Sequence, residues 1–189
     1  MSLESTLRRD ALAIFKAALK AADPREAIRR HVTCNESRLQ VGRKRYDLAC
    51  YHRVIALGAG KASARMAQTL EALLGRRITQ GLINTKYGHA ARLKRIDLHE
   101  CGHPVPDAAG VAGSRRIAAL AAEATGEDLV IVLISGGASA LMPLPSAPIE
   151  LEEKQETTRL LLACGAAIQE INAVRASMIC DTILPSALC

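Results

Sequence analysis

The segment that organises this chain is Arg53-Val54-Ile55-Ala56-Leu57-Gly58-Ala59-Gly60-Lys61-Ala62-Ser63. It begins as a short apolar run of strand length, passes two glycines and enters a helix-forming region, with Lys61 expected on the first helical turn. Glycine allows the backbone to approach a ligand closely or to adopt positive φ. Free N–H groups at a helix N-terminus beside a cation suit an anionic ligand, either phosphate or carboxylate. A plain turn between a strand and a helix is the alternative interpretation.

Two familiar nucleotide-binding motifs are excluded at this turn. The dinucleotide fingerprint G-x-G-x-x-G would continue from Gly58 and Gly60 to glycine or alanine at position 63, where the chain has Ser63. A P-loop would need glycine five residues before Gly60 and serine or threonine directly after the lysine, but Ile55 and Ala62 stand there. Other features of the chain must therefore decide what the turn binds.

Strands and helices are expected to alternate along the chain. Short apolar runs predict buried strands, and apolar residues three and four positions apart predict helices. The expected strands are 54–57, 80–84, 95–100 and 129–134, the last of them central, and the expected helices are 4–21, 24–32, 61–74, 108–125 and one from about 151. A polar connection through residue 46 precedes the first strand. This order predicts an α/β fold with a parallel sheet and helices on both faces.

A second glycine-rich turn, Ser135-Gly136-Gly137-Ala138-Ser139-Ala140-Leu141, follows the last strand. Its N–H groups could form an anion-binding nest in which Ser135 and Ser139 also donate. It could also be a structural turn, or a degenerate nucleophile elbow that lacks the second glycine of G-x-S-x-G and has no histidine after position 103. In a parallel sheet both glycine turns would lie at the carboxyl edge, where ligands bind.

His103 lies in the loop Gly102-His103-Pro104-Val105-Pro106-Asp107, whose alternate prolines make it rigid. The histidine could be a structural or surface residue, or it could contact a substrate or serve as an acid–base group. Lys61 and Lys86 are both candidate phosphate partners. Lys61 is the better placed of the two because it stands beside a glycine turn.

The composition limits the classes of partner. Aromatic residues are 2% and tryptophan is absent, which argues against a nucleic-acid surface built on base stacking. The net charge of +6 favours a small anionic substrate over nucleic acid. The six cysteines show no C-x-x-C pairing, and we see no signal peptide or long apolar span. We therefore expect a cytoplasmic protein with reduced thiols, no metal-ligand cluster and no membrane association.

Several motifs occur together in one order. They are Gly58-Ala59-Gly60-Lys61-Ala62-Ser63, Gly102-His103-Pro104-Val105-Pro106-Asp107, Leu133-Ile134-Ser135-Gly136-Gly137-Ala138-Ser139-Ala140-Leu141, Leu151-Glu152-Glu153-Lys154 and Ile171-Asn172-Ala173-Val174-Arg175. Together they resemble the glycerate 2-kinase family, whose members have often been labelled hydroxypyruvate reductases. The resemblance covers about residues 4–175.

The resemblance implies a Rossmann-like α/β domain that transfers the γ-phosphoryl group of ATP to the 2-hydroxyl of D-glycerate with Mg²⁺. By the family pattern Lys61 is the catalytic lysine. The residues expected to bind substrate or phosphate are Gly58, Gly60, Ser63, His103, Ser135, Gly136, Gly137 and Ser139. Phosphoryl transfer suits such a site because it needs positioning and positive charge rather than a covalent nucleophile.

The chain departs from the family pattern at two places. Ala138 replaces the third glycine of the S-G-G-G-S turn, and the pattern is lost after Arg175. We expect residues 1–175 to form the N-terminal Rossmann-like domain and residues 176–189 an unrelated tail, with the second domain absent. A site without that second wall would be weakly active or inactive, and its exposed surfaces would favour a homo-oligomer.

Two alternatives to a kinase stay open from the sequence. One is a non-catalytic fragment that binds small anions or pairs with a partner chain. The other is an NAD(P)-dependent hydroxypyruvate reductase, against which the failed dinucleotide fingerprint counts.

Overall fold

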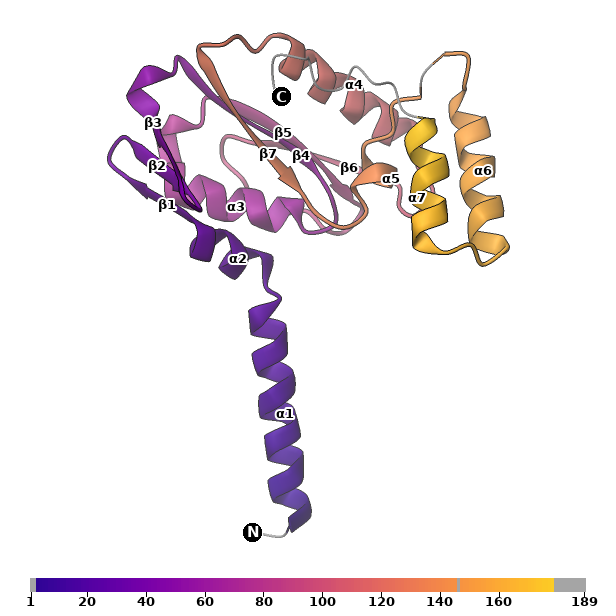
Figure 1. Cartoon of the computed structure of the whole chain (residues 1–189), viewed down its shortest axis with the longest axis horizontal. Coiled ribbons are helices and arrows are strands. Elements are labelled where there is room, and N and C mark those ends of the chain that lie inside the picture. The colour runs from indigo at the N-terminus through magenta and orange to yellow at the C-terminus, as the bar shows by residue number, and fades with distance from the viewer. Residues whose placement is uncertain (1–2, 146, 179–189) are drawn as a thin grey trace.

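The structure of the chain is a computed structural model that describes residues 3–145 and 147–178 (Figure 1). The helices are α1 (Leu3–Ala21), α2 (Pro24–His31), α3 (Ser63–Leu74), α4 (Ala108–Ala122), α5 (Ala138–Leu141), α6 (Leu151–Ala163) and α7 (Ile168–Ser177), with the short 3₁₀ turns η1 (Leu48–Cys50) and η2 (Gly75–Arg77). The strands are β1 (Val32–Asn35), β2 (Arg38–Val41), β3 (Lys44–Asp47), β4 (Arg53–Ala59), β5 (Gln80–Lys86), β6 (Asp97–Cys101) and β7 (Asp128–Ile134).

Four parallel strands form the main sheet, in the order β6-β5-β4-β7. Taken in chain order this is 3-2-1-4, which agrees with the first four strands of the Rossmann order. The chain enters this sheet at the inner strand β4 and continues outward through β5 to β6. It then returns to place β7 on the other side of β4. Ligands of such sheets bind where the strand order reverses, at the carboxyl ends, and here that point lies between β4 and β7.

The two faces of the sheet are covered by different helices (Figure 1). Successive side chains of a strand point to opposite faces. On one face Val54 and Ala56 of β4 share a buried cluster with Leu70 of α3. On the other face Ile55 and Leu57 cluster with Ile117 of α4. The prediction of an α/β parallel sheet with helices on both faces is confirmed.

The prediction that the strand at 129–134 is central in the sheet is wrong for the part of the chain that the structure describes. There β7 pairs with β4 alone and forms an edge of the sheet. Val132 is 46% exposed and Ile134 is 50% exposed, values that a central strand would not show. A continuous apolar run predicts burial but does not say which strands pair on either side, so the sequence pattern missed the edge.

The segment expected to be a polar connection is also different in the structure. It forms a second, antiparallel sheet of three short strands in the order β1-β2-β3. Two residues anchor this small sheet to the core beside α3: Leu39 is 1% exposed and Leu48 is 4% exposed. Four-residue strands with polar outer faces carry too few apolar positions for the alternation to be recognised.

Helix ends follow local signals more closely than strand positions do. Asp23 caps α2 by accepting a hydrogen bond from the N–H of Arg25 at 2.8 Å, with Pro24 at the first helical position. Asp107 caps α4 through the N–H of Gly110 at 2.8 Å. Both caps confirm the sequence prediction. The far end of α4 is at Ala122, before Gly126, so that glycine does not end the helix.

The N-terminal helix α1 projects from the body of the molecule beside α2 (Figure 1). It buries none of its residues, and the predicted apolar stripe is exposed, with Leu7 at 60% and Ile14 at 72%. Among the described residues, no helix has both the length and the apolar character needed to cross a bilayer.

Candidate functional site

The two glycine turns are hydrogen-bonded to each other. The N–H of Lys61 donates to the carbonyl of Gly136 at 3.0 Å, and the N–H of Ser135 donates to the carbonyl of Ala59 at 3.1 Å. The N–H of Ala62 donates to Ser135 Oγ at 3.0 Å. The turns after β4 and β7 therefore form one structure at the point where the strand order reverses.

Gly60 is required for this contact between the turns. Its φ is +141°, a backbone conformation that residues with a side chain rarely adopt. A methyl group at this position would collide with Ser135 Oγ and lie 2.7 Å from the carbonyl oxygen of Ser135. The hydroxyl of Thr85 also fixes the carbonyl of Gly60, at 3.2 Å.

Gly58 and Ser63 lie in the interior rather than at the ligand edge. A methyl group at Gly58 would collide with the carbonyl oxygen of Leu133 on the neighbouring strand. Ser63 is fully buried, and its hydroxyl donates to the same carbonyl at 3.1 Å and lies 3.2 Å from Ser135 Oγ. Both residues thus lie beneath the turns, and a contact of either with a ligand stays a prediction.

Lys61 stands in the turn itself and not on the first turn of the helix. The helix α3 begins at Ser63 with Ala62 as its N-cap, so the predicted start is two residues too early. The Lys61 side chain is exposed, while its backbone carbonyl lies 3.1 Å from His89 Nδ1. The backbone is thus held on both sides, and the ammonium group is free to reach solvent or a ligand.

The side chains of Lys61 and His103 meet over Gly137. Gly137 has φ of +91°, and a methyl group there would lie 2.7 Å from His103 Nε2 and 3.5 Å from Lys61 Cε. The proline-braced loop and both glycine turns are therefore brought to one place. This convergence of segments that lie far apart in the sequence is the central geometric feature of the site.

The second turn offers backbone donors at this place. Among the described residues, we find no hydrogen-bond partner for the N–H groups of Gly136 and Gly137, which leaves them available to an anion. Ser139 lies one residue inside the short helix α5 and is partly buried. A nucleophile elbow would need Ser139 hydrogen-bonded to a histidine, and no such bond to His103 is found among the described residues.

The electrostatic potential at His103 is positive, because cations act on its ring. Burial lowers the pKa of its imidazole, and the charges of Lys61, Lys86 and Arg175 lower it further. The ring is therefore neutral near pH 7 and can donate or accept a hydrogen bond. A partly buried place surrounded by three cations is suited to an anionic ligand.

We expect the imidazole of His103 to titrate below its usual pKa of 6.5. Two-dimensional NMR of the ring, assigned with His103→Asn, would measure this. Lys61→Gln should raise the midpoint, because it removes one of the cations that oppose protonation. The folded state holds this proton less readily than the unfolded chain, so protonation lowers stability below about pH 6.5. A midpoint at or above the usual value, unchanged in Lys61→Gln, would contradict this description of the site.

A comparison with known protein families identifies the family of this chain. The sequence pattern of a family described as a domain of unknown function, DUF4147, matches residues 10–179. The chain belongs to the DUF4147 family. The match includes both glycine turns and the His103 loop, and the resemblance to glycerate 2-kinases noted from the motifs is confirmed by the relatives of this DUF4147 chain.

Three proteins similar to this chain carry the names of enzymes. A glycerate 2-kinase of Pyrococcus horikoshii is 40% identical over 169 residues, which are 89% of this chain and 38% of the relative. A protein of Agrobacterium vitis named putative hydroxypyruvate reductase is 44% identical over 123 residues, covering 65% of this chain and 32% of the relative. The crystal structure of a glycerate kinase from Thermotoga maritima superposes with a TM-score of 0.72 at 34% identity, covering 92% of this chain and 39% of that one.

The DUF4147 chain thus spans less than two fifths of the length of each of these relatives. The expected boundary at residue 175 falls within α7, which continues to Ser177. Residues 179–189 of the expected tail lie outside the described residues. The boundary between residues 1–175 and 176–189 stays a prediction.

Metal-ligating groups are not gathered at this site. In residues 3–145 and 147–178 no group of three or more His, Cys, Asp or Glu side chains could hold a metal ion. Cations rather than carboxylates surround His103. The residues described here do not form a protein cage for Mg²⁺, an ion that prefers oxygen ligands.

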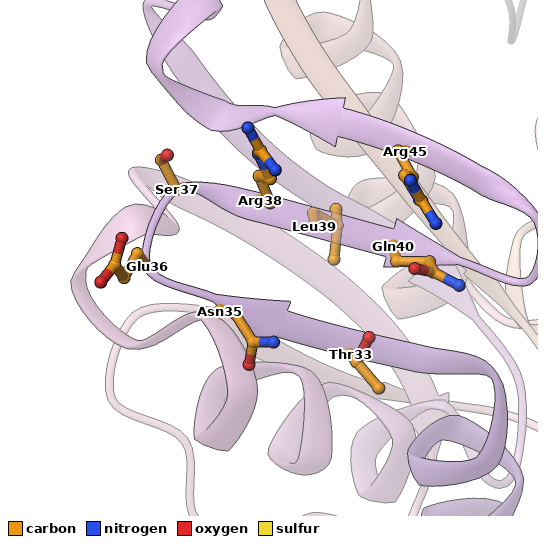
Figure 2. A pocket seen from close by; sticks show the side chains of 8 residues that line it. All are labelled: Thr33, Asn35, Glu36, Ser37, Arg38, Leu39, Gln40 and Arg45. Carbon is orange, nitrogen blue, oxygen red and sulfur yellow. The ribbon is translucent and has the colours of Figure 1, made fainter.

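A cavity of about 590 Å³ lies on the small antiparallel sheet, away from the residues predicted for the site (Figure 2). Its lining comes from β1, β2, β3 and the turn between β1 and β2: Thr33, Asn35, Glu36, Ser37, Arg38, Leu39, Gln40 and Arg45. Residues of the glycine turns and of the His103 loop take no part in the lining. The cavity therefore belongs to the outer surface of the small sheet.

The sequence alone assigns no role to Arg175. In the structure its charge lowers the pKa of His103. The residue closes one of the motifs of the family resemblance, and that was the signal available. Its burial, at 8% exposed, became visible only in the structure.

Proposed function

We propose that the protein carrying this chain transfers the γ-phosphoryl group of ATP to the 2-hydroxyl of D-glycerate. The convergence of Lys61, His103 and the Gly137 turn at the strand-order reversal carries the proposal. Relatives named glycerate 2-kinase and glycerate kinase supply the reaction. The chain covers only part of these relatives, so the activity, the substrate and the nucleotide all belong to the proposal.

In this proposal Lys61 is the catalytic residue. Its exposed ammonium would neutralise charge on the phosphoryl oxygens during transfer, which is the main demand of this chemistry. The N–H groups of Gly136 and Gly137 would hold a phosphate or carboxylate oxygen, and neutral His103 would hydrogen-bond the substrate. Ser139 and the hydroxyl of Ser135 are further candidate donors. Gly60 contributes by allowing the two turns to approach.

Mg²⁺ enters the proposal only with the nucleotide. When bound with the nucleotide, it would offset the negative charge of the phosphate groups. The described residues do not form a dedicated site for it, so we assign it no protein ligand. A cytoplasmic location, where ATP is available, and self-association complete the proposal.

A coupled assay tests the reaction directly. The purified protein is expected to release ADP only when ATP, Mg²⁺ and D-glycerate are all present, with ³¹P NMR identifying 2-phosphoglycerate as the product. L-glycerate is the matched control substrate. Where turnover is slow, isothermal calorimetry should still detect the binding of ATP and of D-glycerate. Oxidation of NADPH or NADH by hydroxypyruvate, without binding of ATP, would replace the kinase proposal by a reductase.

A further inference from the structure

Arg175 of α7 carries a buried guanidinium group of which two nitrogens lack a partner among the described residues. The residue is 8% exposed, and its Nε and Nη2 have no hydrogen-bond partner in the part of the chain that the structure describes. Burial lowers the pKa of the group, although arginine keeps its charge in proteins. Buried polar groups are almost always hydrogen-bonded, and an unpaired buried charge is costly. A missing partner for this edge of the guanidinium is therefore the natural explanation.

A second buried cation, Lys154, lies beside it and has a structural explanation. Its side chain is fully buried, and its Nζ donates to the carbonyl oxygens of Arg175 at 3.5 Å and of Met178 at 3.3 Å. These carbonyls belong to the end of α7, where helices leave acceptors unpaired. Burial and the charge of Arg175 lower the pKa of Lys154 to about 8. Lys154 thus caps the helix, and this leaves the guanidinium of Arg175 unexplained.

Nε and Nη2 form the edge of the Arg175 guanidinium that has no partner among the described residues. The same edge of two other arginines in this chain binds a carboxylate. Nε and Nη2 of Arg53 bind the carboxylate of Asp128 at 2.9 and 2.6 Å. The same two nitrogens of Arg25 bind Asp23, at 3.1 and 2.7 Å for the shortest contact of each. Two parallel N–H groups match the two oxygens of a carboxylate or phosphate.

The position of Arg175 connects it to the candidate site. The helix α7 packs against α5, which directly follows the turn at Ser135–Gly137 (Figure 1). The charge of Arg175 lowers the pKa of His103, whose ring touches Gly137. The groups that face His103 electrostatically are the cations Lys61, Lys86 and Arg175. All of them favour a bound anion.

We propose that Arg175 binds an oxyanion of the ligand, a carboxylate or a phosphate, through its Nε and Nη2 groups where α7 packs against α5. Within the proposed function this oxyanion is the carboxylate of D-glycerate or a phosphate of ATP, and to that extent the proposal rests on the function. Its physical basis is independent, because a buried guanidinium edge without partners is costly whatever reaction follows.

Calorimetry on two variants and a control tests this role. Arg175→Met keeps much of the side-chain volume but removes the charge. Arg175→Lys keeps the charge but lacks the two parallel N–H groups of the guanidinium. Arg159→Met is the matched control, an exposed arginine of α6 that pairs with Glu156. D-glycerate, ATP and inorganic phosphate are titrated separately at constant ionic strength. We expect Arg175→Met to weaken at least one of them about tenfold or more, Arg175→Lys to restore little, and Arg159→Met to bind as wild type.

The outcomes distinguish a carboxylate from a phosphate as the bound oxyanion. They also distinguish the oxyanion site at Arg175 from the proposed kinase function. Loss confined to D-glycerate assigns a carboxylate, and loss of ATP and phosphate assigns a phosphoryl group. Loss of binding in Arg175→Met without kinase turnover in the wild type supports the oxyanion site and contradicts the kinase function. Wild-type affinities in both Arg175 variants overturn the inference. So does a marked fall in the thermal midpoint of both variants without added anion, because it would show that the guanidinium already has a partner within the protein.

Discussion

Replacing Lys61 by alanine is expected to lower the kcat of glycerate phosphorylation about 10²- to 10³-fold, the usual effect of removing one electrostatic donor from a transition state. The Lys61 ammonium is exposed in the turn, while its backbone N–H is fixed to Gly136 at 3.0 Å. Alanine keeps that backbone contact and removes only the charge. The fold should therefore be preserved, as checked by circular dichroism and thermal unfolding.

The kinetic pattern distinguishes chemistry from binding. Loss of an interaction made only in the transition state lowers kcat and kcat/KM together, whereas uniform binding raises KM alone. Lys61→Arg keeps the charge and should retain part of the rate. Lys44→Ala, on the outer strand β3 of the small sheet, is the control that should leave turnover unchanged. Wild-type turnover in Lys61→Ala would remove this lysine from the mechanism.

Replacing Gly60 by alanine is expected to destabilise the fold by about 2–5 kcal/mol, the combined effect of an unfavourable φ and a steric collision. The added methyl group would meet Ser135 Oγ and lie 2.7 and 2.9 Å from the carbonyl oxygen and carbon of Ser135. That serine is held by the N–H of Ala62 and by Ser63, so it has little room to move. Either the turns separate or the strands β4 and β7 shift.

Urea unfolding measures this effect, with Gly126→Ala as the matched control. A methyl group at Gly126 meets no atom within 4 Å, and its φ is not positive, so the change should stay within about 0.5–1 kcal/mol. If Gly60→Ala remains soluble, it should also lose affinity for ATP and D-glycerate, because the two turns no longer share one geometry. Equal unfolding midpoints for the two variants would show that the contact between the turns is not needed for the fold.

Local sequence signals predicted much of this fold. The apolar run before Gly58 became β4, the caps Asp23 and Asp107 start their helices, and the alternation of elements gave the parallel sheet. Each of these depends on residues within a few positions of one another, so a single sequence contains the needed information. The meeting of both glycine turns at one edge also follows, because all carboxyl ends of a parallel sheet lie together.

Features decided by distant partners could not be predicted in this way. The apolar run of β7 indicates burial, yet its place at an edge depends on which strand pairs beside it. The small sheet depends on Leu39 and Leu48 reaching the α3 side of the core. The hydrogen bond from the Ser63 hydroxyl to the carbonyl of Leu133 joins residues 70 positions apart and is likewise set by packing.

The sequence by itself therefore determined the fold class, the helix caps and the two glycine turns with Lys61, because these depend on local backbone preferences and on the period of apolar residues. Only the tertiary structure brought His103 over Gly137 and buried the guanidinium of Arg175, whose Nε and Nη2 have no hydrogen-bond partner among the described residues. Both result from packing between elements separated by tens of residues, and burial is a property of the packed molecule rather than of any segment.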